Sequence, residues 1–356
     1  MEFIVQNALD SAEQMKQEQA PAQANIKVIG CGGAGNNMVS WLYKKGITGA
    51  EVIALNTDAQ HLEITNADRK LLIGKNITRG LGCGGYPKVG AESAVESANE
   101  IKQFIKGTDM VFVCAGMGGG TGTGSAPVVA KLAKEMGAIV IGTVTMPFNI
   151  ERARIDKAEY GLVELRKNCN TVIVIDNNRL VQIAGNLPIQ QAFAVANELI
   201  STMIRGIVET IAVPSLVNLD FADVKAIMNG GGVAAIGVGA SDTKNRVDEA
   251  VRGALSNPLL DIDYAGATGA IIHIHGGPDL TLEETKMVGE QVTKEMDPDA
   301  NVIWGARISD DMRGKLVVMT IITGVTSPWI LGENTKSEFQ AENKRRLSSE
   351  LGIDLV

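Results

Sequence analysis

A glycine- and hydroxyl-rich stretch at residues 116–125 carries the groups best suited to binding an anion. Six of its ten residues are glycine, and three more are threonine or serine. An apolar run at 109–115 precedes it and predicts a buried strand, while 126–136 has apolar residues at helical spacing. A strand, a glycine turn and a helix aim free main-chain N–H groups and the positive end of the helix dipole at one point. The stretch therefore predicts a phosphate-binding loop, because a flexible linker does not fit between a buried strand and an amphipathic helix.

Two further glycine clusters also follow predicted strands. The first, Gly30–Gly35, matches GxGxxG between a strand at 26–30 and a helix at 36–46, and alone it favours a dinucleotide-dependent oxidoreductase. The second is Gly80–Gly85. Three glycine loops are more than one dinucleotide pyrophosphate needs, so they indicate a longer phosphate chain. No GxxxxGKS or GxxxxGKT motif occurs, which excludes a Walker-type nucleotide site.

Carboxylates at two distant places are candidates for chemistry. Asp220 and Asp223 stand three residues apart at the start of a predicted helix, hence on one face. Helix capping is an equally good explanation for Asp220. Glu151 follows the predicted strand at 138–145 beside the glycine loops, where it could accept hydrogen bonds from ribose hydroxyls, and Arg154 could add a donor. A solvated helix start explains both of these residues equally well.

The elements that must position these residues predict an α/β fold in two parts. Strands of a parallel sheet are predicted at 26–30, 51–56, 71–73, 109–115, 138–145 and 171–176, with a helix at about 87–106. The longest helical period runs over 188–212, and at ~1.5 Å per residue it spans roughly 37 Å, enough to bridge two domains. A smaller α/β domain is predicted from strands at 233–238, 270–274, 301–304 and 316–323 and helices near 243–256 and 281–296.

Composition and charge exclude several classes of function. The net charge is −8, so nucleic acid is not an expected partner. The four cysteines are scattered without a CxxC pair, which fits a reducing compartment without zinc. His273 and His275 would share one strand face, but no third ligand is evident, so no protein metal cluster is expected. No apolar run is long enough to span a membrane and no signal peptide is visible, so the expectation is a cytoplasmic protein without direct membrane insertion.

Six separated motifs in this order resemble the tubulin/FtsZ family of GTPases. They are Gly32–Asn36, Asn56–Asp58, Gly80–Gly85, Gly118–Gly124, Met146–Phe148 and Asn218–Asp223. The resemblance covers about residues 26–325, and the 149–154 segment and short polar tail are more similar to the archaeal-type FtsZ branch than to the bacterial one, with a second paralogue as one interpretation. Arg152 stands where that family usually has glycine, and the segment from Glu151 to Arg154 is one residue shorter than usual.

The residue pattern and the resemblance together predict five regions of the chain. These are an N-terminal helical arm at 1–25, a GTP-binding domain at 26–187, a central connecting helix at 188–213, a C-terminal GTPase-activating domain at 214–330 and a polar tail at 331–356.

The resemblance also implies a GTP/GDP site on the first domain. Glu151 and Arg154 would lie at the ribose, Phe193 would stack on guanine, and Asn197 one turn later would read the edge of the base. The residues implied to hold the phosphates are Gly32, Gly33, Ala34, Gly35, Asn36, Gly118, Gly119, Gly120, Thr121, Gly122, Thr123 and Gly124.

The resemblance gives the distant acids a role in a neighbouring subunit. Subunits of this family stack head to tail into filaments, and Asp220 and Asp223, assisted by Asn218, would complete hydrolysis on the next subunit's nucleotide with Mg²⁺ on the phosphates. The expected partner is therefore a second copy of this chain, with a paralogue or membrane-tethering division proteins possible at a mid-cell ring. A cell-shape scaffold with weak hydrolysis is the near alternative.

Overall fold

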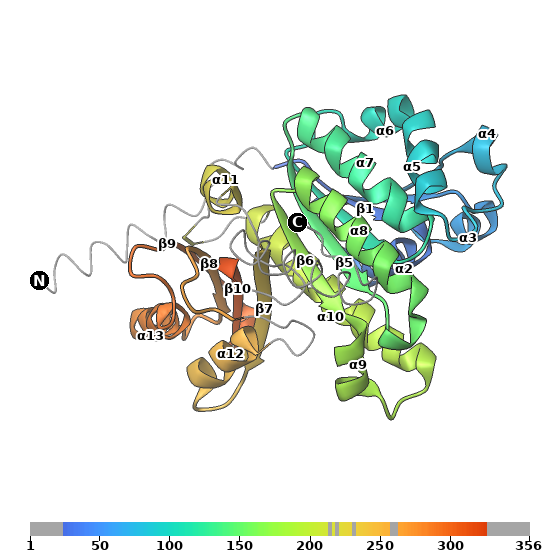
Figure 1. Ribbon diagram of the computed structural model, residues 1–356. Helices are drawn as coiled ribbons and strands as arrows, with labels where there is room; N and C mark the ends of the chain where they lie inside the picture. Colours follow the sequence, from blue (N-terminus) through green and yellow to red (C-terminus); the bar gives the residue numbers. More distant parts are fainter. Residues whose placement is uncertain (1–23, 213–215, 218–220, 230–232, 257–262, 326–356) are drawn as a thin grey trace, which may run out of the picture.

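The computed structural model describes residues 24–212, 216–217, 221–229, 233–256 and 263–325. The predicted arm at 1–25 and the tail at 331–356 fall almost wholly outside these ranges. Figure 1 shows two lobes, with the longest helix, α10 (Ile189–Ala212), between them.

The larger lobe is built on a parallel sheet with the strand order β3-β2-β1-β4-β5-β6. Its strands are β1 (Ile26–Cys31), β2 (Ala50–Asn56), β3 (Arg69–Leu72), β4 (Met110–Gly116), β5 (Ile139–Met146) and β6 (Thr171–Asp176). The order reverses between β1 and β4, and ligands of open α/β sheets bind at such a point beyond the carboxyl ends of the strands.

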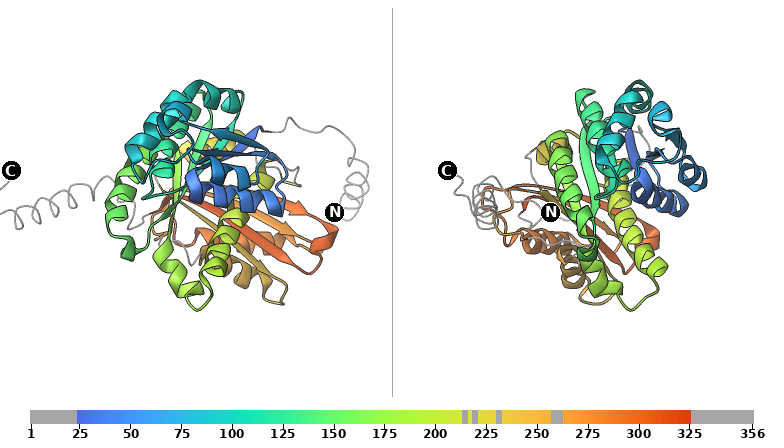
Figure 2. Two further views of the ribbon diagram at one scale, coloured as in Figure 1. Left: turned by 90° about the vertical axis from the view of Figure 1, so that its right-hand side faces the viewer. Right: turned by 45° about the vertical axis from the view of Figure 1, so that its right-hand side comes forward.

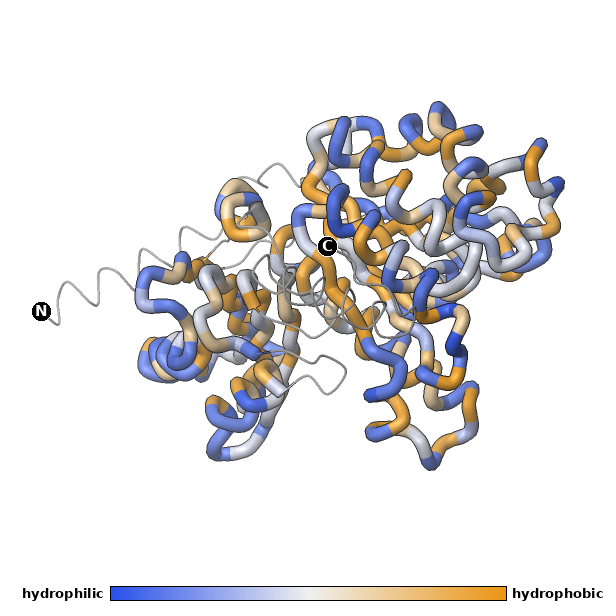
Figure 3. Tube along the Cα trace, viewed as in Figure 1, coloured by the Kyte–Doolittle hydropathy of each residue, from blue (hydrophilic) through white to orange (hydrophobic). Residues whose placement is uncertain are grey.

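Helices cover both faces of this sheet, because its strands are apolar on both sides. On β1, Ile29 and Cys31 pack with one set of helices, while Ile26 and Val28 pack with the other. The first set is α5 (Pro87–Glu96), α6 (Ala98–Ile105), α7 (Thr121–Glu135) and α8 (Ala153–Asn168). The second is α2 (Gly32–Lys45), α3 (Ala59–Ile64), α9 (Asn177–Ala184) and α10. Short helices α4 (Lys75–Thr78) and η1 (Asn149–Glu151) complete this lobe. Figure 3 shows the apolar residues gathered along the strands and α10.

The connecting helix α10 packs lengthwise against α2 (Figure 2). Its buried positions, including Ile200, Ile204 and Ile207, recur at helical spacing. At the edge of this contact, Trp41 Nε1 donates to Glu198 Oε2 at 2.7 Å, and Lys45 Nζ lies 3.1 Å from the same carboxylate. The predicted bridging helix is therefore confirmed almost residue for residue.

The smaller lobe has its own sheet with the order β7-β10-β8-β9. Its elements are α11 (Phe221–Asn229), β7 (Val233–Ser241), α12 (Arg246–Leu255), β8 (Gly269–Gly276), α13 (Leu282–Thr293), β9 (Asn301–Ile308), η2 (Asp310–Met312) and β10 (Leu316–Val325). Among the described residues this sheet meets the first one at a single parallel pair, Val172 with Val233. The two sheets thus form one continuous ladder with a one-pair junction.

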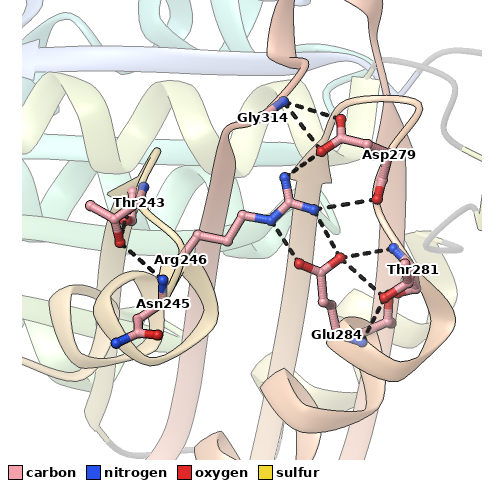
Figure 4. Close-up of polar contacts among 9 residues, drawn as sticks. Thr243, Asn245, Arg246, Asp279, Thr281, Glu284 and Gly314 are labelled. Atoms are coloured by element: carbon pink, nitrogen blue, oxygen red, sulfur yellow. Dashed lines mark hydrogen bonds and ion pairs between the residues drawn. The ribbon is translucent and has the colours of Figure 1, made fainter.

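Arg246 ties the helices of the smaller lobe together (Figure 4). Its guanidinium lies 2.7 Å from Glu284 Oε1 on α13 and 2.6 Å from Asp279 Oδ2 in the preceding loop. Thr281 and Glu284 form the capping box that starts α13. The Arg246 hydrogen bonds hold the pKa of both carboxyl groups below their usual values, with the amide of Gly314 contributing most at Asp279.

One prediction about the larger lobe needs correction. The single helix expected over 87–106 is two helices, which meet at Ser97. There the backbone leaves helical geometry (φ −94°, ψ 13°), and the Ser97 hydroxyl accepts a hydrogen bond from the amide of Gly74 at 3.1 Å. A serine that bonds to another segment favours such a break.

Over the part of the chain with described structure, no helix is both long and apolar enough to cross a membrane.

Candidate functional site

The loop from β4 to α7 is a tight turn built around Gly118. Gly118 has φ +96°, a conformation that glycine adopts without strain. Its amide donates to Thr123 Oγ1 at 2.9 Å, and the neighbouring amide of Met117 donates to the carbonyl of Thr145 at 2.9 Å. These bonds fix the turn so that α7 begins at Thr121.

The loop from β1 to α2 lies directly against this turn, because β1 and β4 are neighbours in the sheet. Gly32 has φ +71°, and a Cβ there would lie 2.6 Å from the amide nitrogen of Gly122. A Cβ on Gly35 would lie 2.3 Å from the carbonyl oxygen of Cys114. These glycines are therefore required for the close approach of the two loops, and both helix N-termini converge on one place.

Two glycines face open space instead. A Cβ on Gly119 would meet no atom within 4 Å, and one on Gly33 would meet only His61 Nε2 at 3.8 Å. Glycine is not needed at these two positions for packing within the chain. Their missing side chains leave main-chain groups accessible to a ligand, as a phosphate cradle requires.

The hydroxyls of this loop brace the chain, which differs from the expectation that they point to a phosphate. Thr123 is buried and accepts from Gly118. Ser125 is buried, and its hydroxyl donates to the carbonyl of Thr121 at 2.6 Å. Thr121 Oγ1 lies 2.7 Å from Thr57 Oγ1. The groups left for a ligand are mainly the amides.

Asn36 is also turned inward, with no solvent exposure. With its amide oriented to suit its neighbours, Nδ2 lies 2.9 Å from the carbonyl oxygen of Gly30 and Oδ1 lies 3.0 Å from Asn56 Nδ2. Asn56 Oδ1 in turn accepts from the amide of Thr57 at 2.9 Å. These two asparagines fix the ends of β1 and β2, a role that the sequence did not reveal for Asn56.

The glycine loop at 80–85 packs against the loop at 116–125. A Cβ on Gly120 would lie 2.7 Å from Cys83 Cβ, and Cys83 Sγ lies 3.3 Å from Thr57 Oγ1. Lys157 on α8 donates to the carbonyl of Gly85 at 2.8 Å. All three glycine loops therefore lie together at one edge of the sheet, as a shared phosphate cradle would require.

Glu151 and Arg154 lie beside the same turn. The two side chains are joined by an ion pair of 2.7 Å, and the other oxygen of Glu151 accepts from the amide of Phe148 at 3.0 Å. A Cβ on Gly118 would lie 2.9 Å from the carbonyl oxygen of Arg154, so the shortened segment still reaches the loop. Arg152 between them has φ 34° and ψ −91°, a strained conformation for a residue with a side chain.

Phe193 and Asn197 share one face of α10, as their spacing predicts. Phe193 is 40% exposed and meets Phe148 edge-on at 6.1 Å between ring centroids. A pocket of about 230 Å³ opens here, lined by these rings and by α9 residues such as Leu180 and Val181. Asn197 makes no hydrogen bond to any other residue that the structure describes. An aromatic ring, an apolar pocket and a free amide together suit a purine base.

Asp223, the predicted catalytic acid that the structure describes, lies on the other lobe. Asp223 is exposed in the first turn of α11, and Figure 1 shows this helix on the side where β1 begins, away from the glycine loops. Val217 forms an antiparallel bridge with Ala306 of β9, through hydrogen bonds of 3.1 and 3.2 Å. Asn218 and Asp220 lie outside the described residues. The structure therefore does not bring the acid of α11 together with the loops within one subunit.

Comparison with known proteins accounts for both lobes. Residues 25–185 match the model of the tubulin/FtsZ family GTPase domain, and residues 232–326 match the FtsZ family C-terminal domain. "Cell division protein FtsZ 2" of Methanocaldococcus jannaschii is 56% identical, covering 99% of this chain and 96% of that protein. The chain belongs to the FtsZ family.

Other relatives agree with this membership. "Cell division protein FtsZ 2" of Halobacterium salinarum is 51% identical over 97% of this chain and 89% of its own length. Among solved structures, an empty FtsZ dimer from M. jannaschii is 50% identical, covers 89% of this chain and 92% of that one, and superposes with a TM-score of 0.78. The predicted FtsZ-type fold and family are confirmed, and the oxidoreductase alternative drawn from Gly30–Gly35 is wrong.

Proposed function

We propose that this chain is a cell-division GTPase that binds GTP at its glycine loops and hydrolyses it between subunits of a head-to-tail filament. The observation that carries the proposal is the separation of two half-sites. Gly33 and Gly119 leave an open main-chain cradle on one lobe, while Asp223 is exposed on the other lobe without a hydrogen bond to a described partner. A heterologous contact that does not close joins such halves and extends a filament.

Each part of the nucleotide has a matching part of the site. The amides of the 30–35 and 116–121 turns and the N-terminus of α7 suit the phosphates. The Glu151–Arg154 pair suits the ribose, because its carboxylate can accept hydroxyl hydrogens. Phe193 and Asn197 suit guanine through stacking and hydrogen bonding. Main-chain N–H groups do not titrate, so they remain hydrogen-bond donors as the pH changes. The two turns are therefore preorganised for the negative charge that develops on the phosphates during phosphoryl transfer.

Mg²⁺ fits this site as a companion of the nucleotide. The described residues contain no group of three His, Cys, Asp or Glu side chains able to hold a metal, and Mg²⁺ is commonly held largely by substrate phosphates and water. When bound, it would neutralise phosphate charge. On this account, Asp220 and Asp223 of the following subunit orient the attacking water and a carboxylate accepts its proton, while Asn218 assists by hydrogen bonding.

The family and the printed names of its relatives also favour a place of action at the mid-cell division site, with a second copy of the chain as principal partner. A paralogue or a membrane-tethering division protein would then recruit the filament.

The central experiment measures filament pelleting and phosphate release together, over a range of protein concentrations, with GTP and Mg²⁺. We expect turnover per subunit to rise with concentration and to follow the pelleted fraction. A turnover per subunit that stays constant from dilute to concentrated protein would mean that each subunit has a complete site.

Asp223→Asn tests the acid directly. We expect GTP binding to be kept and turnover to fall by about a hundredfold, because the water loses a group that acts only in the transition state. Asp242→Asn, an exposed acid elsewhere on the same lobe, is the matched control and should turn over at the parent rate. Parent turnover in Asp223→Asn would contradict the shared site.

A further inference from the structure

A histidine ring lies beside the open face of the phosphate cradle. His61 belongs to α3, the helix that follows β2, and it is half-buried. A Cβ on Gly33 would lie 3.8 Å from His61 Nε2, and among the described residues it would meet no other neighbour within 4 Å. The side of Gly33 that is left bare for a ligand therefore faces an imidazole nitrogen.

The main chain of α3 fixes where this ring lies. The amide of His61 donates to Asp58 Oδ1 at 3.0 Å, and this bond caps the start of the helix. The carbonyl of His61 accepts from Thr65 Oγ1 at 2.8 Å near the end of the helix. Neither bond involves the imidazole, so a change of the side chain at position 61 leaves both of them in place.

A chain of hydrogen bonds assigns the proton on the ring. Asn56 Oδ1 accepts from the amides of Thr57 and Asp58 at 2.9 and 3.2 Å, which fixes the orientation of the Asn56 amide group. Its Nδ2 lies 3.0 Å from Asn36 Oδ1 and 3.4 Å from His61 Nδ1. Because Nδ2 is a donor only, the ring nitrogen Nδ1 accepts and carries no proton. In the neutral imidazole the proton is therefore on Nε2, the nitrogen that faces the cradle.

Other side-chain donors near the cradle are engaged within the chain. The Ser125 hydroxyl donates to a carbonyl of its own loop, Arg154 is paired with Glu151, and Lys157 donates to the 80–85 loop. His61 Nε2, in contrast, makes no hydrogen bond to a described residue. Its N–H group is available at the place where a phosphate oxygen would lie, and hydrogen bonds to charged acceptors are the stronger kind.

We propose that His61 Nε2 donates a hydrogen bond to a phosphate oxygen of the nucleotide that lies on Gly33. Asn56 holds the ring in the required tautomer through Nδ1, so the bonded series from Asn36 through Asn56 to His61 ends on the ligand. The inference rests on the proposed GTP site, and it adds one side-chain donor to the main-chain amides of the cradle.

Titration of GDP into the full chain tests the proposal with a matched pair of variants. The amide nitrogen of glutamine can take the place of Nε2, whereas that of asparagine reaches only the place of Nδ1. We expect His61→Asn to weaken GDP binding by about tenfold, because a hydrogen bond to a charged group is lost. His61→Gln should stay within about threefold of the parent. Glu63→Gln, at an exposed position of the same helix, is the control and should bind like the parent.

Two results of this titration would overturn the proposal. Parent affinity in His61→Asn would show that the ring does not contact the phosphates. An equal loss in His61→Asn and His61→Gln would assign the effect to packing of the ring. A parent chain that binds no GDP would refute the proposed GTP site itself, whereas parent affinity in His61→Asn refutes this inference alone.

Nitrogen NMR of the histidine rings gives a readout that does not depend on a variant's fold. The chain has three histidines, so the signal missing from His61→Gln identifies His61 in a chain labelled with ¹⁵N-histidine. We expect a ring protonated at Nε2, with an Nε2 resonance that moves when GDP saturates the site. A ring protonated at Nδ1, or an Nε2 resonance that GDP leaves unchanged, would contradict the proposed hydrogen bond.

Discussion

At the level of single residues, neighbouring glycines of one loop have separate tasks. Gly118 needs its positive φ and would meet the carbonyl of Arg154 if it carried a Cβ, whereas Gly119 meets nothing. The first glycine builds the turn, and the second leaves its outer surface bare. Of these two glycines, only Gly119 therefore allows a substitution that separates ligand binding from folding.

We predict that Gly119→Ala keeps the melting temperature of the nucleotide-free chain within about 2 °C and weakens GDP binding by about tenfold or more. The added methyl group would occupy the surface that a phosphate approaches. Gly289→Ala, whose Cβ also meets no atom within 4 Å, should leave GDP affinity unchanged. Parent affinity in Gly119→Ala, measured by equilibrium titration, would place the phosphates elsewhere.

Arg152 stores backbone strain beside the same site. Its φ of 34° is unfavourable for any residue with a Cβ. We predict that Arg152→Gly stabilises the chain by about 1 kcal/mol in urea unfolding, because glycine adopts positive φ more readily. Arg252→Gly within α12 is the contrasting change and should destabilise by a similar amount. A loss of stability in Arg152→Gly would show that the arginine side chain outweighs the strain.

At the level of elements, the sequence predicted those helices and strands whose apolar residues recur with a regular period. The strands of the larger lobe and α10 follow directly from apolar spacing, because each buries at least one whole face, with the exception of β3, where Arg69 and Lys70 are exposed. The break at Ser97 was not predictable, since it depends on the amide of Gly74, a contact distant in sequence. The apolar pocket beside α9 was missed for the same reason.

The candidate site also has features that the sequence predicted and features that depend on contacts in space. Glycine spacing located the loops, but it could not distinguish the packed Gly35 from the open Gly119, because the difference arises from neighbours in space. Hydroxyl residues suggested phosphate donors, yet Thr123 and Ser125 bond within the loop. Phe193 fits an ordinary core pattern, so only the family resemblance singled it out.

The Arg246 cluster gives the smaller lobe a pH-dependent stability. Asp279 and Glu284 have lowered pKa values in the folded chain, so they favour folding at pH values above their ordinary pKa near 4. That contribution is lost as the pH falls through the lowered values. We predict that Arg246→Met, at a side chain only 11% exposed, costs about 2 kcal/mol at pH 7.

The difference between Arg246→Met and the parent should shrink as the pH falls below about 4, since protonation removes the same interactions. Urea unfolding at a series of pH values measures this difference. Arg252→Met on the same helix provides the control, and should follow the parent curve. A gap that stays constant into acid would assign the loss to packing of the arginine stem.

At the level of the whole molecule, half-sites on different lobes predict complementation. Asp223→Asn lacks the acid, and Gly119→Ala lacks a good phosphate surface, so each alone should turn over little GTP. In an equal mixture that assembles at random, about a quarter of the contacts join an intact cradle to an intact acid. We therefore predict phosphate release at roughly a quarter of the parent rate, and a mixture no faster than its components would contradict a shared site.

The junction of the two sheets has a mechanical consequence. Val172 and Val233 form the only ladder pair between the sheets within the described residues, so a force that pulls the lobes apart is resisted there mainly by side-chain packing, in the core that joins Ile173 of β6 to Ile236 of β7. We expect stretching of a chain of subunits to loosen this packing before either sheet loses its own hydrogen bonds, so that each lobe keeps its fold.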